Sequence, residues 1–207
     1  CKLVALGKPT EKESKKWFKR YEKHLPNTGE IVFFDRSWYT RALVEATMGY
    51  CTKRQYTYFM KNVIPWEKKQ IEDGVEFFKF YLSIEKNTQQ KRIDKRATSP
   101  LVYWKISEND LKMLDKWDAF TLYKEQMFKR TSYDEAPWIV LNANNKKVAI
   151  LSALRFILNA FDYPDKDLPK PKTWSEGLNN YKVEINKVIF ENLSYQQYKT
   201  LRVFADE

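Results

Sequence analysis

Histidine and cysteine are scarce in this sequence. Its 207 residues include one histidine, His24, and two cysteines, Cys1 and Cys51. With a single histidine, this chain cannot form a multi-histidine metal site, and we expect no histidine-based catalytic triad either. The two cysteines form no metal-binding or disulfide pattern, so a reducing cytoplasm is the simplest setting that we predict.

Long apolar runs are also missing. No run approaches the roughly 20 apolar residues that a membrane-spanning helix needs, and no signal peptide is recognisable at the start. We therefore expect no membrane span. Because the sequence begins with Cys1 rather than with Met, we expect a fragment or a processed product.

Apolar, aromatic and basic residues are plentiful. Hydrophobic residues make up 43% of the sequence and aromatic residues 16%, which is enough for the core of one globular domain with a small appendage. The formal net charge of +10 favours a polyanionic partner such as nucleic acid, an anionic membrane surface or polyphosphate. Charge alone does not choose among these partners, and a solvated basic surface explains it equally well.

Short apolar runs alternate with amphipathic stretches. We predict strands at 3–6, 31–34, 75–84 and 138–141, and helices at 11–24, 39–49, 53–73, 86–96, 107–128 and 146–161. Capping boxes precede two of the helices, Thr10 with Glu13 and Thr52 with Gln55, and Pro65 should interrupt or restart the third helix. The strand at 31–34 has the composition of a parallel strand buried on both faces. The alternation predicts an α/β fold, a three-layer α/β/α domain around a parallel sheet.

The end of the chain differs from the rest. Residues 163–173 contain three prolines and several charges, which is typical of an extended linker. We therefore predict a domain at 1–162, and a linker and tail at 163–207 with helices near 182–190 and 195–204.

The sharpest local feature is the stretch IVFFDRSWYTR, in which an apolar strand ends in Asp35. Ligands bind at the carboxyl ends of parallel strands, where an aspartate can hold Mg²⁺. Arg36 follows at once, and Arg41 lies about one helical turn beyond Ser37. Two guanidinium groups beside a carboxylate suit a phosphate chain gripped next to a metal. An ordinary salt bridge between Asp35 and Arg36 would explain the pattern as well.

A basic helix follows the next predicted strand. In QKRIDKR, Arg92 and Arg96 lie at i and i+4 on one helix face, and Lys91 and Lys95 add charge. Because the helix stands between a strand and a Ser-Pro break, we predict a mobile lid, at about 86–112, that brings cations onto phosphates. A solvated basic helix face is the alternative interpretation. Lys105, in YWKIS, is a further candidate for phosphate binding.

The motifs in order resemble a known family. FDRSWY followed by an arginine, VE and MGYCT is similar to the family-2 polyphosphate kinases. The segments GVEFFKFYLSIEKNTQQKRIDKR, SPLVYWKISENDL, KWDAFTLYKEQMFKRTS and APWIVLNANNKK continue the resemblance over roughly residues 3–161. Several motifs in the right order are far more specific than any one of them.

The resemblance implies a P-loop kinase fold and phosphoryl transfer between inorganic polyphosphate and a nucleoside diphosphate or monophosphate, such as ADP/ATP. The implied cofactor is Mg²⁺, which Mn²⁺ could replace. The implied assembly is a homo-oligomer, either a dimer or a tetramer. The implied location is the cytoplasm. The residues carried over are the metal and catalytic aspartate Asp35, the phosphate-contacting Arg36 and Arg41, and the lid residues Arg92, Lys95, Arg96 and Lys105. Of these, Asp35, Arg36 and Arg96 are expected to act in catalysis.

The sequence also departs from the family pattern. Thr40 stands where the family usually has Asn, and Ser99 and Val102 replace a common acidic and basic residue. No G-x-x-x-x-G-K-[ST] motif occurs among the five glycines, although in the family that phosphate-cradling loop precedes the segment near Cys1. We therefore expect that the chain lacks its N-terminal portion and is severely impaired alone. An ATP-dependent nucleoside monophosphate kinase and a non-catalytic polyanion-binding protein are the competing predictions.

Overall fold

The computed structural model describes residues 1–164 and 166, except for the side chains of Lys105 and Glu108. Its strands are β1 (Lys2–Val4), β2 (Val32–Phe34), β3 (Lys79–Ser83) and β4 (Trp138–Asn142). Its helices are α1 (Glu11–Lys15), α2 (Lys19–Glu22), η1 (Trp38–Arg41), α3 (Val44–Met48), α4 (Lys53–Glu72), α5 (Lys86–Thr98), η2 (Tyr103–Lys105), α6 (Glu108–Asp115), α7 (Trp117–Thr131) and α8 (Lys146–Ala160). The helices predicted at 182–190 and 195–204 lie outside the described residues.

The chain divides into two compact units, each built around one pair of parallel strands. The first unit comprises Cys1–Phe77 and Asp115–Thr131, and the second comprises Phe78–Leu114 and the chain from Ser132 onward. Strand β1 pairs with β2, and β3 pairs with β4 over five residues. The expected α/β class with parallel strands is confirmed, and the described strands form two separate pairs. The expected boundary at 162/163 stays a prediction.

Aromatic side chains form the core of the first unit. Trp38 lies at its centre, with its ring 4.8 Å from that of Trp66 and 5.7 Å from that of Tyr21. Its indole nitrogen donates to the Glu67 carboxylate at 2.9 Å, which gives this fully buried side chain a hydrogen bond. Phe18 stacks on Phe59 and Trp66. These contacts attach α2 and α4 to the segment that follows β2.

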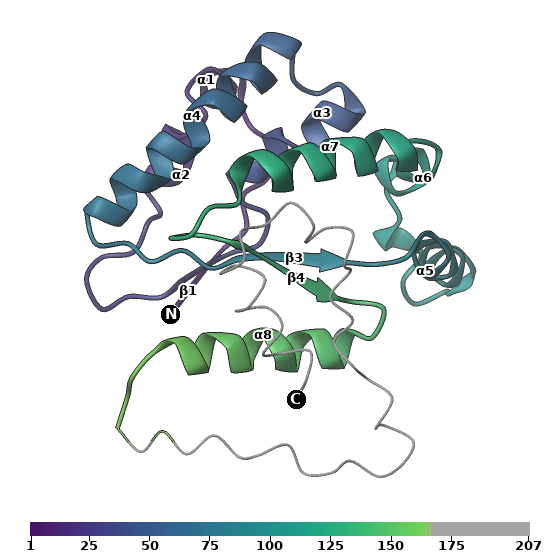
Figure 1. The fold of residues 1–207 in the computed structure, drawn as a ribbon. Helices are drawn as coiled ribbons and strands as arrows, with labels where there is room; N and C mark the ends of the chain where they lie inside the picture. Colours follow the sequence, from purple (N-terminus) through teal and green to yellow (C-terminus); the bar gives the residue numbers. More distant parts are fainter. Residues whose placement is uncertain (165, 167–207) are drawn as a thin grey trace. The chain divides into compact units, whose positions relative to one another are not determined.

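The second unit places α8 against its strand pair, as the ribbon in Figure 1 shows. Phe156 of α8 packs edge-to-face on Phe80, with ring centroids 5.7 Å apart. Strand β4 is buried along Trp138–Leu141, which explains the continuous apolar run in its sequence. Asn145 begins α8 by accepting from the amides of Lys147 and Val148.

Several predicted elements differ from the structure in detail. The helix expected at 11–24 is two short helices, because the backbone of Lys16 leaves the helical region (φ −118°, ψ 58°). The helix expected at 107–128 is likewise divided into α6 and α7. Helix α4 runs without interruption through Pro65, which lies on its exposed side. The strand expected to be buried on both faces is partly open, since Phe33 of β2 is 42% exposed.

Candidate active site

Asp35 lies at the carboxyl end of β2. Its backbone amide donates to the carbonyl of Val4 at 2.9 Å, so the pairing with β1 fixes this position. The side chain is exposed, and within residues 1–164 and 166 it has no hydrogen bond or ion pair. The salt bridge with Arg36 that would have given this aspartate a purely structural role is therefore not formed among the described residues. An exposed carboxylate at a strand end is free to bind a ligand.

Arg36 is the one non-glycine residue with a positive φ in the part of the chain that the structure describes, at 65°. This left-handed conformation costs a residue with a side chain about 1 kcal/mol, and such residues cluster at functional sites. The guanidinium group is exposed, and no partner for it is found among the described residues. The turn thus directs both charged side chains into solvent immediately after the strand.

Arg41, which is predicted to contact phosphate, is buried in the structure. Its side chain is 2% exposed and its Nε lies 2.7 Å from a carboxylate oxygen of Glu45. Its guanidinium carbon lies 3.9 Å from the ring centroid of Trp17, and Nη2 donates to the Ser14 hydroxyl at 3.1 Å. Burial raises the pKa of Glu45 although Arg41 opposes the shift. Arg41 therefore lies buried among the helices that follow β2, whereas Asp35 at the end of β2 lies at the surface.

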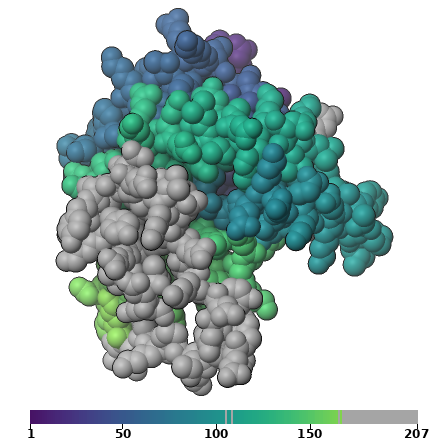
Figure 2. Space-filling view, turned by 45° about the vertical axis from the view of Figure 1, so that its right-hand side comes forward, coloured from purple at the N-terminus to yellow at the C-terminus, as the bar shows by residue number. Residues whose placement is uncertain are grey.

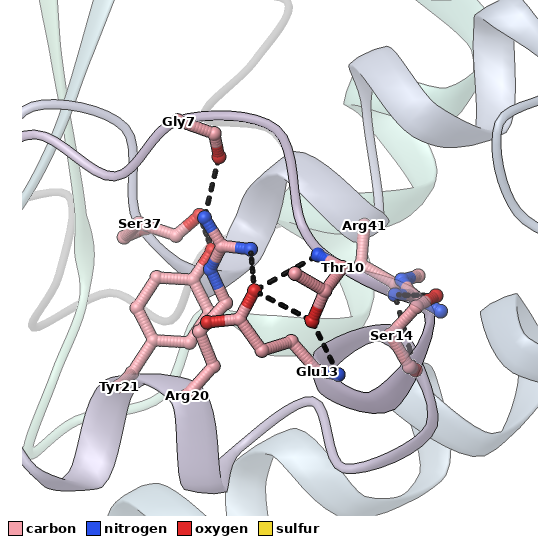
Figure 3. Close-up of polar contacts among 8 residues, drawn as sticks. All are labelled: Gly7, Thr10, Glu13, Ser14, Arg20, Tyr21, Ser37 and Arg41. Atoms are coloured by element: carbon pink, nitrogen blue, oxygen red, sulfur yellow. Dashed lines mark hydrogen bonds and ion pairs between the residues drawn. The ribbon is translucent and has the colours of Figure 1, made fainter.

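A polar network links the α1–α2 segment to the loop that follows β1 (Figure 3). Thr10 and Glu13 form the predicted capping box, with the Thr10 amide donating to Glu13 at 2.9 Å. These bonds with Thr10, the backbone amide first, lower the pKa of Glu13. Arg20, which is 6% exposed, pairs with Glu13 at 3.1 Å and donates to the carbonyl of Gly7. The network holds residues 7–10 against α2.

The same segment contacts the loop that follows β2. The Tyr21 hydroxyl donates to the carbonyl of Ser37 at 3.3 Å, and the Trp17 indole nitrogen donates to the carbonyl of Trp38 at 3.0 Å. Burial raises the pKa of Tyr21, so its hydroxyl remains a donor at neutral pH. Both loops at the carboxyl edge of β1 and β2 are therefore held by one short segment.

The predicted lid residues belong to α5 and η2, within the second unit. Arg92 of α5 donates to the carbonyls of Ala143 and Asn144, at 2.8 and 2.9 Å. The amide of Glu85 donates to the Asn144 side chain at 3.0 Å. These bonds fix the start of α5 to the loop after β4. Arg92 thus lies at the carboxyl ends of β3 and β4, with its donors directed to the backbone.

The remainder of this basic helix is more open. Lys91 and Lys95 are exposed, and the α5 segment lies at the surface in the space-filling view (Figure 2). Arg96 is half-buried, 3.5 Å from the Asp110 carboxylate. Lys105 belongs to η2, and its side chain is not described. The phosphate-binding roles of these residues stay predictions.

The residues around Asp35 decide whether this strand end could hold a metal ion. Among the described residues there is no group of three or more His, Cys, Asp or Glu side chains that could hold a metal ion. Mg²⁺ in phosphate-transferring sites needs only one or two carboxylates, because waters and substrate phosphates supply the other ligands. Asp35, an exposed carboxylate at a strand end with no partner in the described part of the chain, fits this requirement.

Comparison with known proteins decides the family. Residues 1–169 match the family model described as polyphosphate kinase 2 (PPK2). The chain belongs to the polyphosphate kinase 2 family. It is 46% identical over 168 residues to a GDP-polyphosphate phosphotransferase of Mycolicibacterium smegmatis, covering 81% of this chain and 59% of that protein. It is 41% identical over 168 residues to ADP-polyphosphate phosphotransferase 1 of Rhizobium meliloti, covering 81% of this chain and 56% of that protein.

The polyphosphate kinase 2 fold is confirmed by a solved structure. The crystal structure of polyphosphate kinase 2 from Arthrobacter aurescens TC1 has a TM-score of 0.70 and 30% identity to this chain, covering 81% of it and 62% of that chain. The expected P-loop kinase-like α/β class agrees with this match. The chain spans less than two thirds of the length of each of these three relatives.

Sequence reasoning missed the residues that fix the strand-end loops. The sequence predicted no role in the site for Arg20, Tyr21 or Glu45. The hydrogen bonds of Tyr21 and Arg20 could not be predicted from sequence periodicity. Their acceptors are backbone carbonyls distant in sequence, which any residue type could provide. Glu45 lies four residues after Arg41, a spacing that could have indicated the ion pair.

Proposed function

We propose that this chain is part of an enzyme that transfers a phosphoryl group between inorganic polyphosphate and a nucleoside diphosphate. The observation that carries the proposal is a pair of exposed charges, Asp35 and Arg36, at the end of β2 in a member of the polyphosphate kinase 2 family; neither has a partner among the residues that the structure describes. The relatives' names include GDP and ADP as substrates, which supports a diphosphate acceptor. Location in the cytoplasm and a dimer or tetramer belong to the same proposal.

The chemistry needs alignment and charge neutralisation more than covalent help. An oxygen of the nucleotide's terminal phosphate attacks the end phosphorus of polyphosphate, the bond to the next phosphate breaks, and the chain leaves one phosphate shorter. The attacking oxygen is already an anion, so no general base is required. A bound divalent cation, Mg²⁺ or Mn²⁺, would lower the charge repulsion between donor and acceptor.

Each residue has a distinct part in this proposal. Asp35 would hold the cation at the strand end, and Arg36 would bind and neutralise the phosphate beside it. Arg96 and Lys95 would contact phosphates from α5, and Lys105 from η2. Arg41 and Arg92, whose guanidinium groups are held by the protein itself, would position the loops that carry these contacts.

Replacement of Asp35 with Asn tests the proposal in the intact protein. Transfer from polyphosphate to ADP or GDP should fall by about 10² to 10³-fold, a loss typical of a transition-state charge contact. The fold should be unaffected because the side chain is exposed. The matched control is Asp73→Asn, which changes the same charge at the exposed end of α4 and should leave turnover unchanged.

The donor and acceptor are tested together with this variant. The wild-type protein is offered ADP, GDP or AMP with either polyphosphate or ATP as donor, with and without Mg²⁺. Transfer from polyphosphate that needs Mg²⁺ and falls by at least about a hundredfold in Asp35→Asn supports the proposal. Transfer from ATP alone, or wild-type turnover in Asp35→Asn, would contradict it.

A further inference from the structure

Tyr21 and Arg20 occupy adjacent positions in α2 and contact different loops. Tyr21 reaches the loop after β2 and Arg20 the loop after β1. We propose that both are positioning residues for phosphoryl transfer: they fix the two loops at the carboxyl edge of β1 and β2, and so the placement of Asp35 and Arg36. The inference rests on the proposed function, and it concerns residues that do not touch substrate.

Tyr21 holds the backbone immediately after Arg36. Its hydroxyl donates to the carbonyl of Ser37 at 3.3 Å, and the side chain is 3% exposed, so water does not compete for this bond. The Ser37 hydroxyl accepts from the Tyr39 amide at 3.4 Å. The peptide that follows the left-handed Arg36 is thus fixed by Tyr21 on one side and by the start of η1 on the other.

Arg20 has the corresponding role at the loop after β1. It binds the carbonyl of Gly7 and the carboxylate of Glu13 with different nitrogens, so the loop, the cap of α1 and α2 are joined through one guanidinium group (Figure 3). Its Nε is buried without a hydrogen-bond partner among the described residues. A buried, incompletely paired arginine is costly for stability, which favours a role in geometry over one in stability alone.

Tyr21→Phe tests the proposal because it removes one hydroxyl and leaves the ring packing on Trp17 and Trp38 intact. In the intact protein we expect kcat to fall about tenfold, the Mg²⁺ concentration for half-maximal rate to rise, and KM for the nucleotide to change less than about twofold. Amide hydrogen exchange at residues 36–38 should become faster, a readout that is independent of activity.

Tyr56→Phe is the matched control. The Tyr56 hydroxyl also donates a single hydrogen bond, to the Gln126 side chain at 3.1 Å, within the same unit. The two variants should lower the melting temperature by similar amounts, but only Tyr21→Phe should change kcat, the Mg²⁺ dependence and the exchange at 36–38.

Arg20→Lys provides a second test. Lysine keeps the positive charge but has no fork that donates to Gly7 and Glu13 with separate nitrogens. We expect kcat to fall at least tenfold with faster amide exchange in residues 7–10.

The outcomes separate this proposal from the proposed function. If wild type turns over but Tyr21→Phe and Arg20→Lys keep its kcat and Mg²⁺ dependence, the positioning role is wrong and the function stands. If Tyr56→Phe lowers kcat as much as Tyr21→Phe does, the effect is one of general stability and the positioning role is again wrong. An inactive wild type overturns the proposed function, while unchanged exchange at 36–38 in Tyr21→Phe independently overturns the positioning.

Discussion

Arg36 adopts a backbone conformation that glycine tolerates better than any other residue. Its φ of 65° directly follows the Asp35 strand end, and the strain is retained where both side chains are exposed. An exposed arginine without a partner in the described chain does little for stability. The combination supports the ligand-binding role that we propose for this side chain.

Arg36→Gly should separate activity from stability. Glycine relieves about 1 kcal/mol of left-handed strain but adds a similar entropy to the unfolded chain, so the free energy of unfolding should stay within about 1 kcal/mol of wild type. Transfer activity should fall by at least about a hundredfold because the guanidinium group is lost. Denaturant unfolding and steady-state turnover measure the two effects.

Arg36→Lys is the companion variant, since it keeps both the strain and the charge. It should retain more activity than Arg36→Gly at equal or lower stability. A glycine variant with wild-type turnover would show that Arg36 does not contact phosphate.

At the scale of elements, the turn that leads into β2 is fixed by Glu30. Its carboxylate accepts from Lys2 of β1 at 2.8 Å and from the Asn27 amide at 3.1 Å. The hydrogen bond from Lys2, followed by that from Asn27, lowers the pKa of Glu30 from 4.5 to about 2. One side chain thus joins the turn to the neighbouring strand.

The lowered pKa has a defined consequence for acid stability. A group whose pKa is lowered in the folded state stabilises it above its unfolded pKa and loses that effect as the pH falls toward the folded pKa. The difference in melting temperature between wild type and Glu30→Gln should be constant above about pH 5 and should shrink between pH 4.5 and about 2. Because the ion pair lies at the surface, with the Lys2 side chain 59% exposed, high salt should reduce the difference. A difference that grows on acidification would contradict the assignment.

The sequence predicted the start of a helix well where a capping box precedes an amphipathic stretch. It predicted interruptions within helices less well, because tertiary packing decides them. The two capping boxes are formed as expected, at Thr10 and Thr52. Pro65 was expected to interrupt its helix, but buried residues such as Phe59 and Val63 hold α4 on one face while Pro65 lies on the exposed side. The division of α1 and α2 likewise follows from packing around Trp17 and Phe18.

At the scale of the whole molecule, the net charge of +10 should strengthen the binding of a long polyanion more than the binding of a nucleotide. We expect KM for polyphosphate to rise roughly tenfold or more between 50 and 200 mM salt. Binding a polyanion releases its counterions, and added salt opposes that release and so weakens binding. KM for ADP should change much less. Equal salt dependence for both substrates would show that the basic surface does not guide polyphosphate.

The structure adds one finding on membranes. No helix in the described part of the chain is long and apolar enough to cross a bilayer. Cys1 is exposed and Cys51 is half-buried, and both are free.

The sequence by itself determined the α/β class, the family and the location of Asp35 and Arg36, because strand composition, capping residues and ordered motifs are local signals. Only the tertiary structure showed that Arg41 is buried against Trp17 and Glu45, that Arg92 binds backbone carbonyls after β4, and that Tyr21 and Arg20 hold the strand-end loops. These contacts join residues far apart along the chain. Whether a guanidinium group faces solvent or a carbonyl depends on packing, which no local pattern encodes.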